Sequence, residues 1–217
     1  MPQLEAGLAD GLAVLGLSLT PVQQATLLAY LRLLGKWNQV YNLTAVRDPQ
    51  DMLTHHLLDS LAALRPARSF LNELPLERRA VLDVGSGGGL PGVAWSISEP
   101  DWAITCVDAV AKKTGFIRQV SAELGLKHLH ARHSRVEDLH ADTPWPLITS
   151  RAFANLADFT RLTAHLLASQ GVWMALKGRH PTDEIADLPP SVEVFHVEPL
   201  QVPGLDAERC LVWMRPR

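Results

Sequence analysis

The sequence of 217 residues predicts an α/β protein with a Rossmann-like, mostly parallel sheet and a small helical extension at its N-terminus. Three observations support this fold class. From Ala80 onward, strand-like and helix-like patterns alternate along the chain. A glycine-rich loop follows the first of these strands, and an acidic residue, Asp108, closes the second. We therefore expect a helical extension over residues 1–66 and the Rossmann-like domain over residues 67–217.

Helix-capping residues and apolar stripes predict the helices of the N-terminal extension. Residues 1–17 have weak helical character, and we expect this end of the chain to fray. Thr20-Pro21 is suited to open the first definite helix, and Asp48-Pro49 is suited to open the second. We expect the second helix to end within residues 65–68, where a proline stands between two arginines.

The loop after the first core strand is the most informative stretch of the sequence. Glycine occupies five of the eight positions from Gly85 to Gly92, among them Gly87 and Gly89. Each glycine loses extra entropy on folding, so a ligand-binding role explains this density better than packing does. Asp83, at the end of the strand, would repel a pyrophosphate but would tolerate a nucleoside that carries a positive sulfonium.

Asp108 is the second anchor of the predicted ligand site. It follows the loop by somewhat over twenty residues and ends the next apolar run, where a carboxylate is placed to accept hydrogen bonds from ribose hydroxyls. The loop and Asp108 together predict a nucleoside cofactor. After Asp108 we expect two further helices, over Lys112–Leu124 and Leu156–Leu167. The expected further strands are His128–Arg132, Leu147–Ser150 and Val172–Leu176, followed by a closing strand pair, Val192–Val197 and Cys210–Met214.

The charge is distributed unevenly along the chain. A net charge of −3 argues against a general nucleic-acid coat. Between Lys112 and Arg135, however, six lysines and arginines face a single acidic residue, Glu123. This stretch indicates either a specific polyanion partner or a solvated helix face.

The remaining bulk properties predict a soluble cytoplasmic protein. No apolar run approaches the length of a membrane span, and the first residues lack the pattern of a secretory signal. Cys106 and Cys210 lie inside predicted strands, which indicates small buried side chains in a reducing compartment. The histidines between His128 and His140 have no cysteine nearby, so we expect no metal site there. We expect a monomer and no membrane partner.

Four motifs resemble those of one bacterial family. They are Leu-Asp-Val-Gly-Ser-Gly-x-Gly-Leu-Pro-Gly at 82–92, Ser-Arg-Val-Glu at 134–137, Ser-Arg-Ala-Phe at 150–153 and Ala-Leu-Lys-Gly at 175–178. With Asn38, Tyr41–Thr44 and His56–Ser60 upstream, they resemble RsmG, also called GidB, the 16S ribosomal RNA guanine-N7 methyltransferase family. The resemblance implies a class I methyltransferase fold, S-adenosylmethionine as methyl donor and 16S rRNA of the small ribosomal subunit as the partner.

The resemblance also implies roles for individual residues. Gly85 and Leu90 match positions that hold the methionine and ribose part of the donor, and Val136 and Glu137 match the pair beside its adenine. Asp108 matches the ribose-binding acid, and Arg151 matches an arginine at the mouth of the site. The set expected to bind the donor is Asp83, Gly85, Gly87, Gly89, Leu90, Asp108, Val136, Glu137 and Arg151.

Transfer to guanine N7 needs no proton removal, so we expect catalysis by positioning, with Arg151 and His56 as the candidates nearest the reaction. Candidates for contacts to RNA phosphates are Lys112, Lys113, Arg118, Arg132, Arg135 and Lys177. Trp37, Tyr41 and Phe153 are candidates for stacking on a base, with buried packing as the alternative for each. Two other readings stay open: an NAD-dependent oxidoreductase and a non-enzymatic nucleotide-sensing module.

Overall fold

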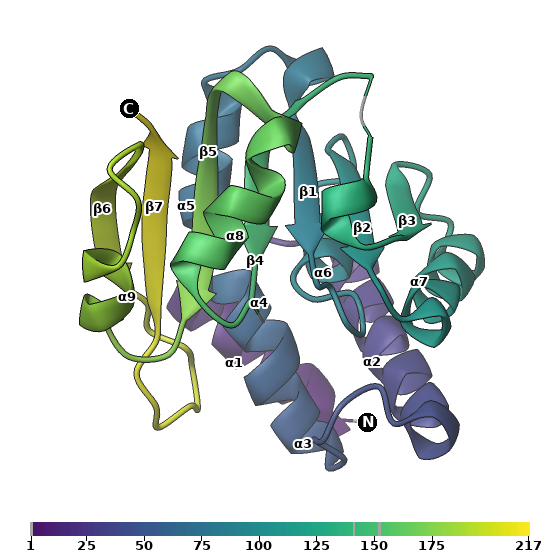
Figure 1. Ribbon diagram of the computed structural model, residues 1–217. Coiled ribbons are helices and arrows are strands. Elements are labelled where there is room, and N and C mark those ends of the chain that lie inside the picture. Colours follow the sequence, from purple (N-terminus) through teal and green to yellow (C-terminus); the bar gives the residue numbers. More distant parts are fainter. Residues whose placement is uncertain (1, 141, 152) are drawn as a thin grey trace.

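The computed structural model describes residues 2–140, 142–151 and 153–217. Ala152, in the predicted Ser-Arg-Ala-Phe motif, lies outside the described residues. One seven-stranded sheet with the order β3-β2-β1-β4-β5-β7-β6 forms the centre of the fold (Figure 1). Its strands are β1 Ala80–Val84, β2 Ala103–Asp108, β3 Leu129–His133, β4 Trp145–Ser150, β5 Leu167–Lys177, β6 Val192–Pro199 and β7 Cys210–Pro216.

The sheet is parallel from β3 to β5, and β7 alone runs antiparallel to both of its neighbours. This confirms the predicted mostly parallel sheet with a closing strand pair. Because β1, β2, β4 and β5 are parallel, the loops that follow them meet at one edge. β5 begins at Leu167, where the sequence predicted the end of a helix, because α8 (Leu156–Thr163) gives way to a short 3₁₀ turn, η4 (Ala164–Leu166).

Helices cover both faces of the sheet, and successive side chains of each strand alternate between two cores. In β1, Val81 belongs to one core and Leu82 to the other. Figure 1 shows α8 on one face and α1, α2 and α6 on the opposite face. The helices on that opposite face are α1 Pro2–Leu15, α2 Pro21–Tyr41, α4 Asp59–Ala62, α5 Leu64–Asn72, α6 Gly92–Ser98 and α7 Ala111–Leu124. Short elements complete the chain: α3 Pro49–Met52, η1 Leu53–Leu58, η2 Leu76–Arg78, η3 Val136–Asp138 and α9 Thr182–Ala186.

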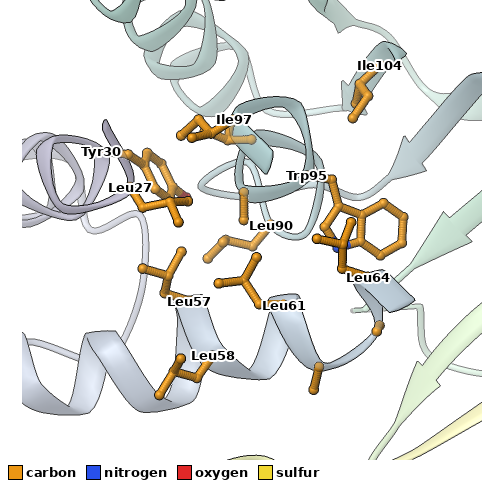
Figure 2. Close-up of a cluster of buried hydrophobic side chains, with 14 of the residues drawn as sticks. Leu27, Tyr30, Leu57, Leu58, Leu61, Leu64, Leu90, Trp95, Ile97 and Ile104 are labelled. Atoms are coloured by element: carbon orange, nitrogen blue, oxygen red, sulfur yellow. The ribbon is translucent and has the colours of Figure 1, made fainter. Parts of the chain in front are cut away.

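The N-terminal helices pack directly on the sheet domain. Leu57, Leu61 and Leu64 point toward Leu90 and Trp95 (Figure 2), and the Trp95 indole donates a hydrogen bond of 2.9 Å to the carbonyl of Ser60. The extension and the face of the sheet thus share one apolar core. The domain boundary between residues 66 and 67 stays a prediction, and α5 runs across it.

Two expectations about the extension were wrong, and two caps were right. Residues 2–15 form a regular helix, α1, because its Gly11 lets Leu58 approach closely and its Leu8 is fully buried. The proline at 66 does not end the helical region, since it lies in the first turn of α5, where its missing N–H is tolerated. The predicted caps at Thr20 and Asp48 are confirmed by side-chain hydrogen bonds to the first turns of α2 and α3.

Candidate functional site

The glycine-rich loop connects β1 to α6 at the carboxyl edge of the sheet. Its first residue, Gly85, has a φ of +67° and donates an N–H hydrogen bond of 2.9 Å to Val107 of β2. A Cβ atom at Gly85 would meet no atom within 4 Å, so the backbone faces open space there. At Gly89, φ is +93° and a Cβ atom would lie 2.4 Å from a methyl of Val93. Only glycine fits this position without strain. The helix begins at Gly92, and Pro91 is its N-cap residue.

Asp83 lies beneath the loop, with its carboxylate turned into the protein. Its Oδ2 accepts a hydrogen bond of 2.9 Å from the N–H of Gly92, at the start of α6, while its Oδ1 has no partner among the described residues. Complete burial raises the pKa of Asp83 to about 7. The sequence placed this carboxylate beside a bound sulfonium. That placement stays a prediction; in the structure the side chain accepts a hydrogen bond at the helix start and lines none of the three pockets described below.

Asp108 links the glycine loop to the end of β2. One carboxylate oxygen accepts from Gly87 N at 3.0 Å, the other accepts from Val110 N at 2.9 Å, and Lys113 Nζ lies 3.7 Å away. The side chain is 7% exposed. Each carboxylate oxygen has two lone pairs, so one acceptor site per oxygen is free for a ligand hydroxyl.

Three pockets lie in a row along this edge of the sheet. The first, which we call the Asp108 pocket, has a volume of about 370 Å³ and contains Gly85, Asp108, Val136 and Glu137 in its wall. Arg135 also lines it and holds the carboxylate of Glu137 at 2.7 Å. That ion pair lowers the pKa of Glu137, together with a hydrogen bond to the backbone N–H of the same residue, which is the larger cause.

The second pocket, the loop pocket, has a volume of about 200 Å³ and shares Gly85 with the first. Leu90, His56, Lys113 and Arg151 stand in its wall, with other loop glycines and Thr44. The shared glycine makes the two pockets neighbours across the loop. An elongated molecule with a nucleoside at one end therefore fits along them.

The third pocket, the Asp59 pocket, has a volume of about 370 Å³ and shares His56 and Arg151 with the loop pocket. Its centre is the carboxylate of Asp59, which is 6% exposed and binds two arginines. Arg151 Nη1 lies 3.2 Å from Oδ2, and Arg209 Nε lies 2.7 Å from Oδ1. Lys177 also lines this pocket and pairs with Glu184 at 2.7 Å. The lining residues thus carry more positive than negative charge.

His56 stands between the loop pocket and the Asp59 pocket. It lies in η1, a π-helical segment that interrupts the predicted regular helix, and its Nε2 is 2.7 Å from Thr44 Oγ1. Burial, followed by the nearby charge of Arg151, lowers the pKa of His56 to about 4. The imidazole is therefore uncharged at neutral pH.

The structure brings most of the predicted donor residues together at the Asp108 and loop pockets. Of the predicted RNA contacts, Lys113, Arg135 and Lys177 line a pocket, whereas Lys112, Arg118 and Arg132 are exposed outside the three pockets. Arg118 donates to the carbonyl of Ala131 at 3.3 Å. Sequence reasoning assigned no role to Asp59 and Arg209, although Asp59 lies in the His56–Ser60 segment of the family resemblance and is an acidic residue inside the apolar stripe of residues 52–64.

A search for similar proteins gave consistent results. A family described as "GidB: rRNA small subunit methyltransferase G" matches residues 23–212. A protein of Methylibium petroleiphilum named "Ribosomal RNA small subunit methyltransferase G" is 59% identical over 97% of this chain and 94% of its own length. A protein of Leptothrix cholodnii with the same name is 60% identical over 95% of this chain and 93% of its own.

Solved structures of low sequence identity share the fold. The N-methyltransferase NodS from Bradyrhizobium japonicum, in complex with S-adenosyl-L-homocysteine, aligns with a TM-score of 0.56 and 14% identity, over 84% of this chain and 98% of its own. TrmN from Thermus thermophilus aligns with a TM-score of 0.55 and 18% identity, over 76% of this chain and 53% of its own. These likenesses confirm the predicted class I methyltransferase fold.

Proposed function

This chain belongs to the GidB family of rRNA small subunit methyltransferase G proteins, and we propose that it transfers a methyl group from S-adenosylmethionine to N7 of a guanosine in 16S rRNA. The target is a single guanosine in a decoding-region loop of the small ribosomal subunit, as the family resemblance implies. The protein acts in the cytoplasm as a monomer. Among the described residues, no helix is long and apolar enough to cross a membrane.

The three adjoining pockets are the observation that supports this proposal. The open backbone at Gly85 offers a cradle for the donor, and the carboxylate of Asp108 offers acceptors for its ribose. Val136 and Glu137 line the Asp108 pocket, where they offer a backbone N–H and a carboxylate to the adenine, and Leu90 lines the loop pocket, which we assign to the methionine part. S-adenosylmethionine supplies an electrophilic methyl group on a positively charged sulfur.

The Asp59 pocket then takes the acceptor nucleotide. It opens beside the loop pocket at His56 and Arg151, so an acceptor held there lies next to the methionine end of the donor site. Guanine N7 carries an in-plane lone pair at neutral pH, and no general base is needed. Holding both partners in line contributes about 7–11 kcal/mol in favourable cases.

The product base of this reaction is cationic, so an uncharged side chain between the donor and acceptor pockets suits it better than a further cation would. His56 is uncharged, because burial holds its pKa near 4, so it does not repel a methylated purine. The guanidinium of Arg151 is partly neutralised by Asp59. Arg151 is therefore suited to bind a phosphate or the donor carboxylate rather than the reacting ring, and Arg151→Ala should weaken binding of one of them.

Methylation of undermethylated small subunits, and of 16S rRNA freed of protein, tests the proposal. With methyl-labelled donor, we expect label at N7 of one guanosine, located by chemical cleavage of the RNA at that base. Label on another atom, or no transfer to either substrate, would contradict it. Calorimetric titration with S-adenosylmethionine and NAD separates this function from an oxidoreductase, and turnover separates it from a sensing module.

A further inference from the structure

An aromatic ladder reaches from the glycine loop to the protein surface. Its rings, in order, are Tyr30, Phe116, Trp37 and Tyr41, with centroids 6.3, 5.4 and 5.0 Å apart. At the inner end, the hydroxyl of the fully buried Tyr30 donates a hydrogen bond of 2.7 Å to the carbonyl of Gly88. At the outer end, Tyr41 is 41% exposed. The ladder thus fixes an exposed ring relative to the donor site.

The outer ring lies close to the loop pocket in the chain and in space. Tyr41 ends α2, and Leu43 and Thr44, two and three residues further along the chain, line the loop pocket. Lys113 lines the same pocket from the first turn of α7, one helical turn before the ladder's Phe116. Figure 1 shows the C-terminal end of α2 beside α7. Tyr41 is therefore joined to the wall of the loop pocket by a single residue of the chain, Asn42, and Lys113 contributes a positive charge to that pocket.

Exposure distinguishes Tyr41 from the other aromatic side chains near the site. Trp37 is half-buried beneath it, and Phe153 is half-buried against Phe159, with ring centroids 5.4 Å apart. The preceding residue, Val40, is 70% exposed and has no ring. An exposed aromatic ring and a pocket that contains Lys113 match the two chemical parts of a nucleotide, a base with a π-face and a phosphate.

We propose that Tyr41 is a stacking platform for a base of the single-stranded rRNA segment that flanks the target guanosine. The inference rests on the proposed function and adds a contact outside the donor and acceptor pockets. Recognition of single-stranded RNA commonly splays bases out and stacks them on aromatic side chains. Because Tyr30 anchors the ladder at Gly88, a base stacked on Tyr41 is held in a fixed position relative to the glycine loop.

Stacking and phosphate contacts respond differently to salt, and this difference gives a specific test. Loss of a base–aromatic stack weakens RNA binding but does not change the number of counterions that binding releases, so the salt dependence stays the same. Loss of a phosphate contact weakens RNA binding and also lowers its salt dependence. We would compare the wild type with Tyr41→Ala, Tyr41→Phe and Tyr41→Leu. The leucine keeps apolar bulk over Trp37 but lacks a ring. Val40→Ala is the matched control, because Val40 is the exposed neighbour outside the ladder.

We expect Tyr41→Ala and Tyr41→Leu to weaken binding of undermethylated 16S rRNA by roughly 5- to 100-fold. The slope of log affinity against log salt and the S-adenosylmethionine affinity should stay at the wild-type values in both variants, and the melting temperature should stay there in Tyr41→Leu. Tyr41→Phe and Val40→Ala should bind RNA as the wild type does. These measurements separate a stacking role from a role in packing.

Wild-type RNA affinity in both Tyr41→Ala and Tyr41→Leu would overturn the inference while leaving the proposed function intact. A parallel loss of donor affinity would also overturn it, because the effect would then pass through the glycine loop. Failure of the wild type itself to methylate the RNA would instead refute the proposed function. The wild-type methylation assay therefore distinguishes the two failures.

Discussion

The two ends of the site are built in different ways. The Asp108 pocket and the loop pocket share the backbone of the glycine loop, which follows β1, and side chains from other segments complete their walls. The Asp59 pocket instead depends on long charged side chains from distant segments, since Arg151 and Arg209 are 92 and 150 residues away from Asp59 in sequence. The proposed donor end is therefore shaped around the backbone of the glycine loop, whereas the proposed acceptor end is held by ion pairs.

Gly89→Ala is the strongest way to test the backbone-built end. A side chain at φ +93° is strained, and its Cβ atom would lie 2.4 Å from Val93. Backbone strain and overpacking together cost about 2–6 kcal/mol. We expect a large loss in the free energy of unfolding, measured with urea, and weaker binding of S-adenosylmethionine. A variant with wild-type stability and affinity would show that the loop is not rigid.

Two buried carboxylates differ in their partners. Asp59 binds two arginines, whereas Asp83 has no cationic partner among its hydrogen-bonded contacts. Burial raises the pKa of Asp83 from 3.8 to about 7. The folded protein therefore favours the protonated carboxyl of Asp83. Its contribution to the free energy of unfolding is fully present below pH 3.8 and is lost as the pH rises to about 7. A difference of that size corresponds to about 4 kcal/mol.

Asp83→Asn should therefore gain stability relative to the wild type as the pH rises. Urea unfolding of both proteins at several pH values between 4 and 8 measures this gain. The asparagine retains an oxygen that accepts from Gly92 N, so the helix start is preserved. A stability difference that does not change with pH would mean that the Asp83 carboxyl ionises as easily in the folded protein as in the unfolded chain.

Asp59→Asn tests the end that depends on ion pairs. It leaves two guanidinium groups, each about a quarter exposed, without a carboxylate. We expect a cost of about 2 kcal/mol, below that of a fully buried pair. The KM for rRNA should rise more than the dissociation constant for the donor, because Arg209 lines only the Asp59 pocket among the three.

The matched control for Asp59→Asn is Glu193→Gln, which removes an exposed ion pair with Arg215, remote from the three pockets. It should leave both unfolding and kinetics unchanged. Equal effects of the two substitutions would show that the Asp59 pocket has no special role.

Gly115→Ala has the smallest expected effect and provides the contrast to Gly89→Ala. Gly115 lies inside α7, and a Cβ atom there would meet no atom within 4 Å. Alanine should stabilise the helix by about 0.5–1 kcal/mol, with no change in donor affinity. Thermal unfolding would detect this gain. A loss of stability would indicate that α7 is constrained in a way its open surroundings do not suggest.

The difference between local and long-range contacts explains which parts of the molecule could be predicted from sequence. The strand, glycine loop and Asp108 lie in one continuous pattern, so local residues predicted the sheet correctly and also predicted a donor site at this loop. The inward orientation of the Asp83 side chain could not be predicted in this way, because it depends on the hydrogen bond from Gly92 N to Asp83 Oδ2 that forms on folding. The partners of Asp59 and the docking of α1 through Gly11 depend on segments that only the fold brings together.

A calorimetric titration of S-adenosylmethionine into the wild type, Gly89→Ala and Arg209→Gln tests the central claim most directly. The claim is that the glycine loop and Asp108 hold the donor, while the Asp59 pocket serves the acceptor. We predict that Gly89→Ala weakens donor binding on the order of tenfold or more, which is at least about 1.4 kcal/mol, and that Arg209→Gln leaves it unchanged. Unchanged binding in Gly89→Ala together with a loss in Arg209→Gln would contradict the claim.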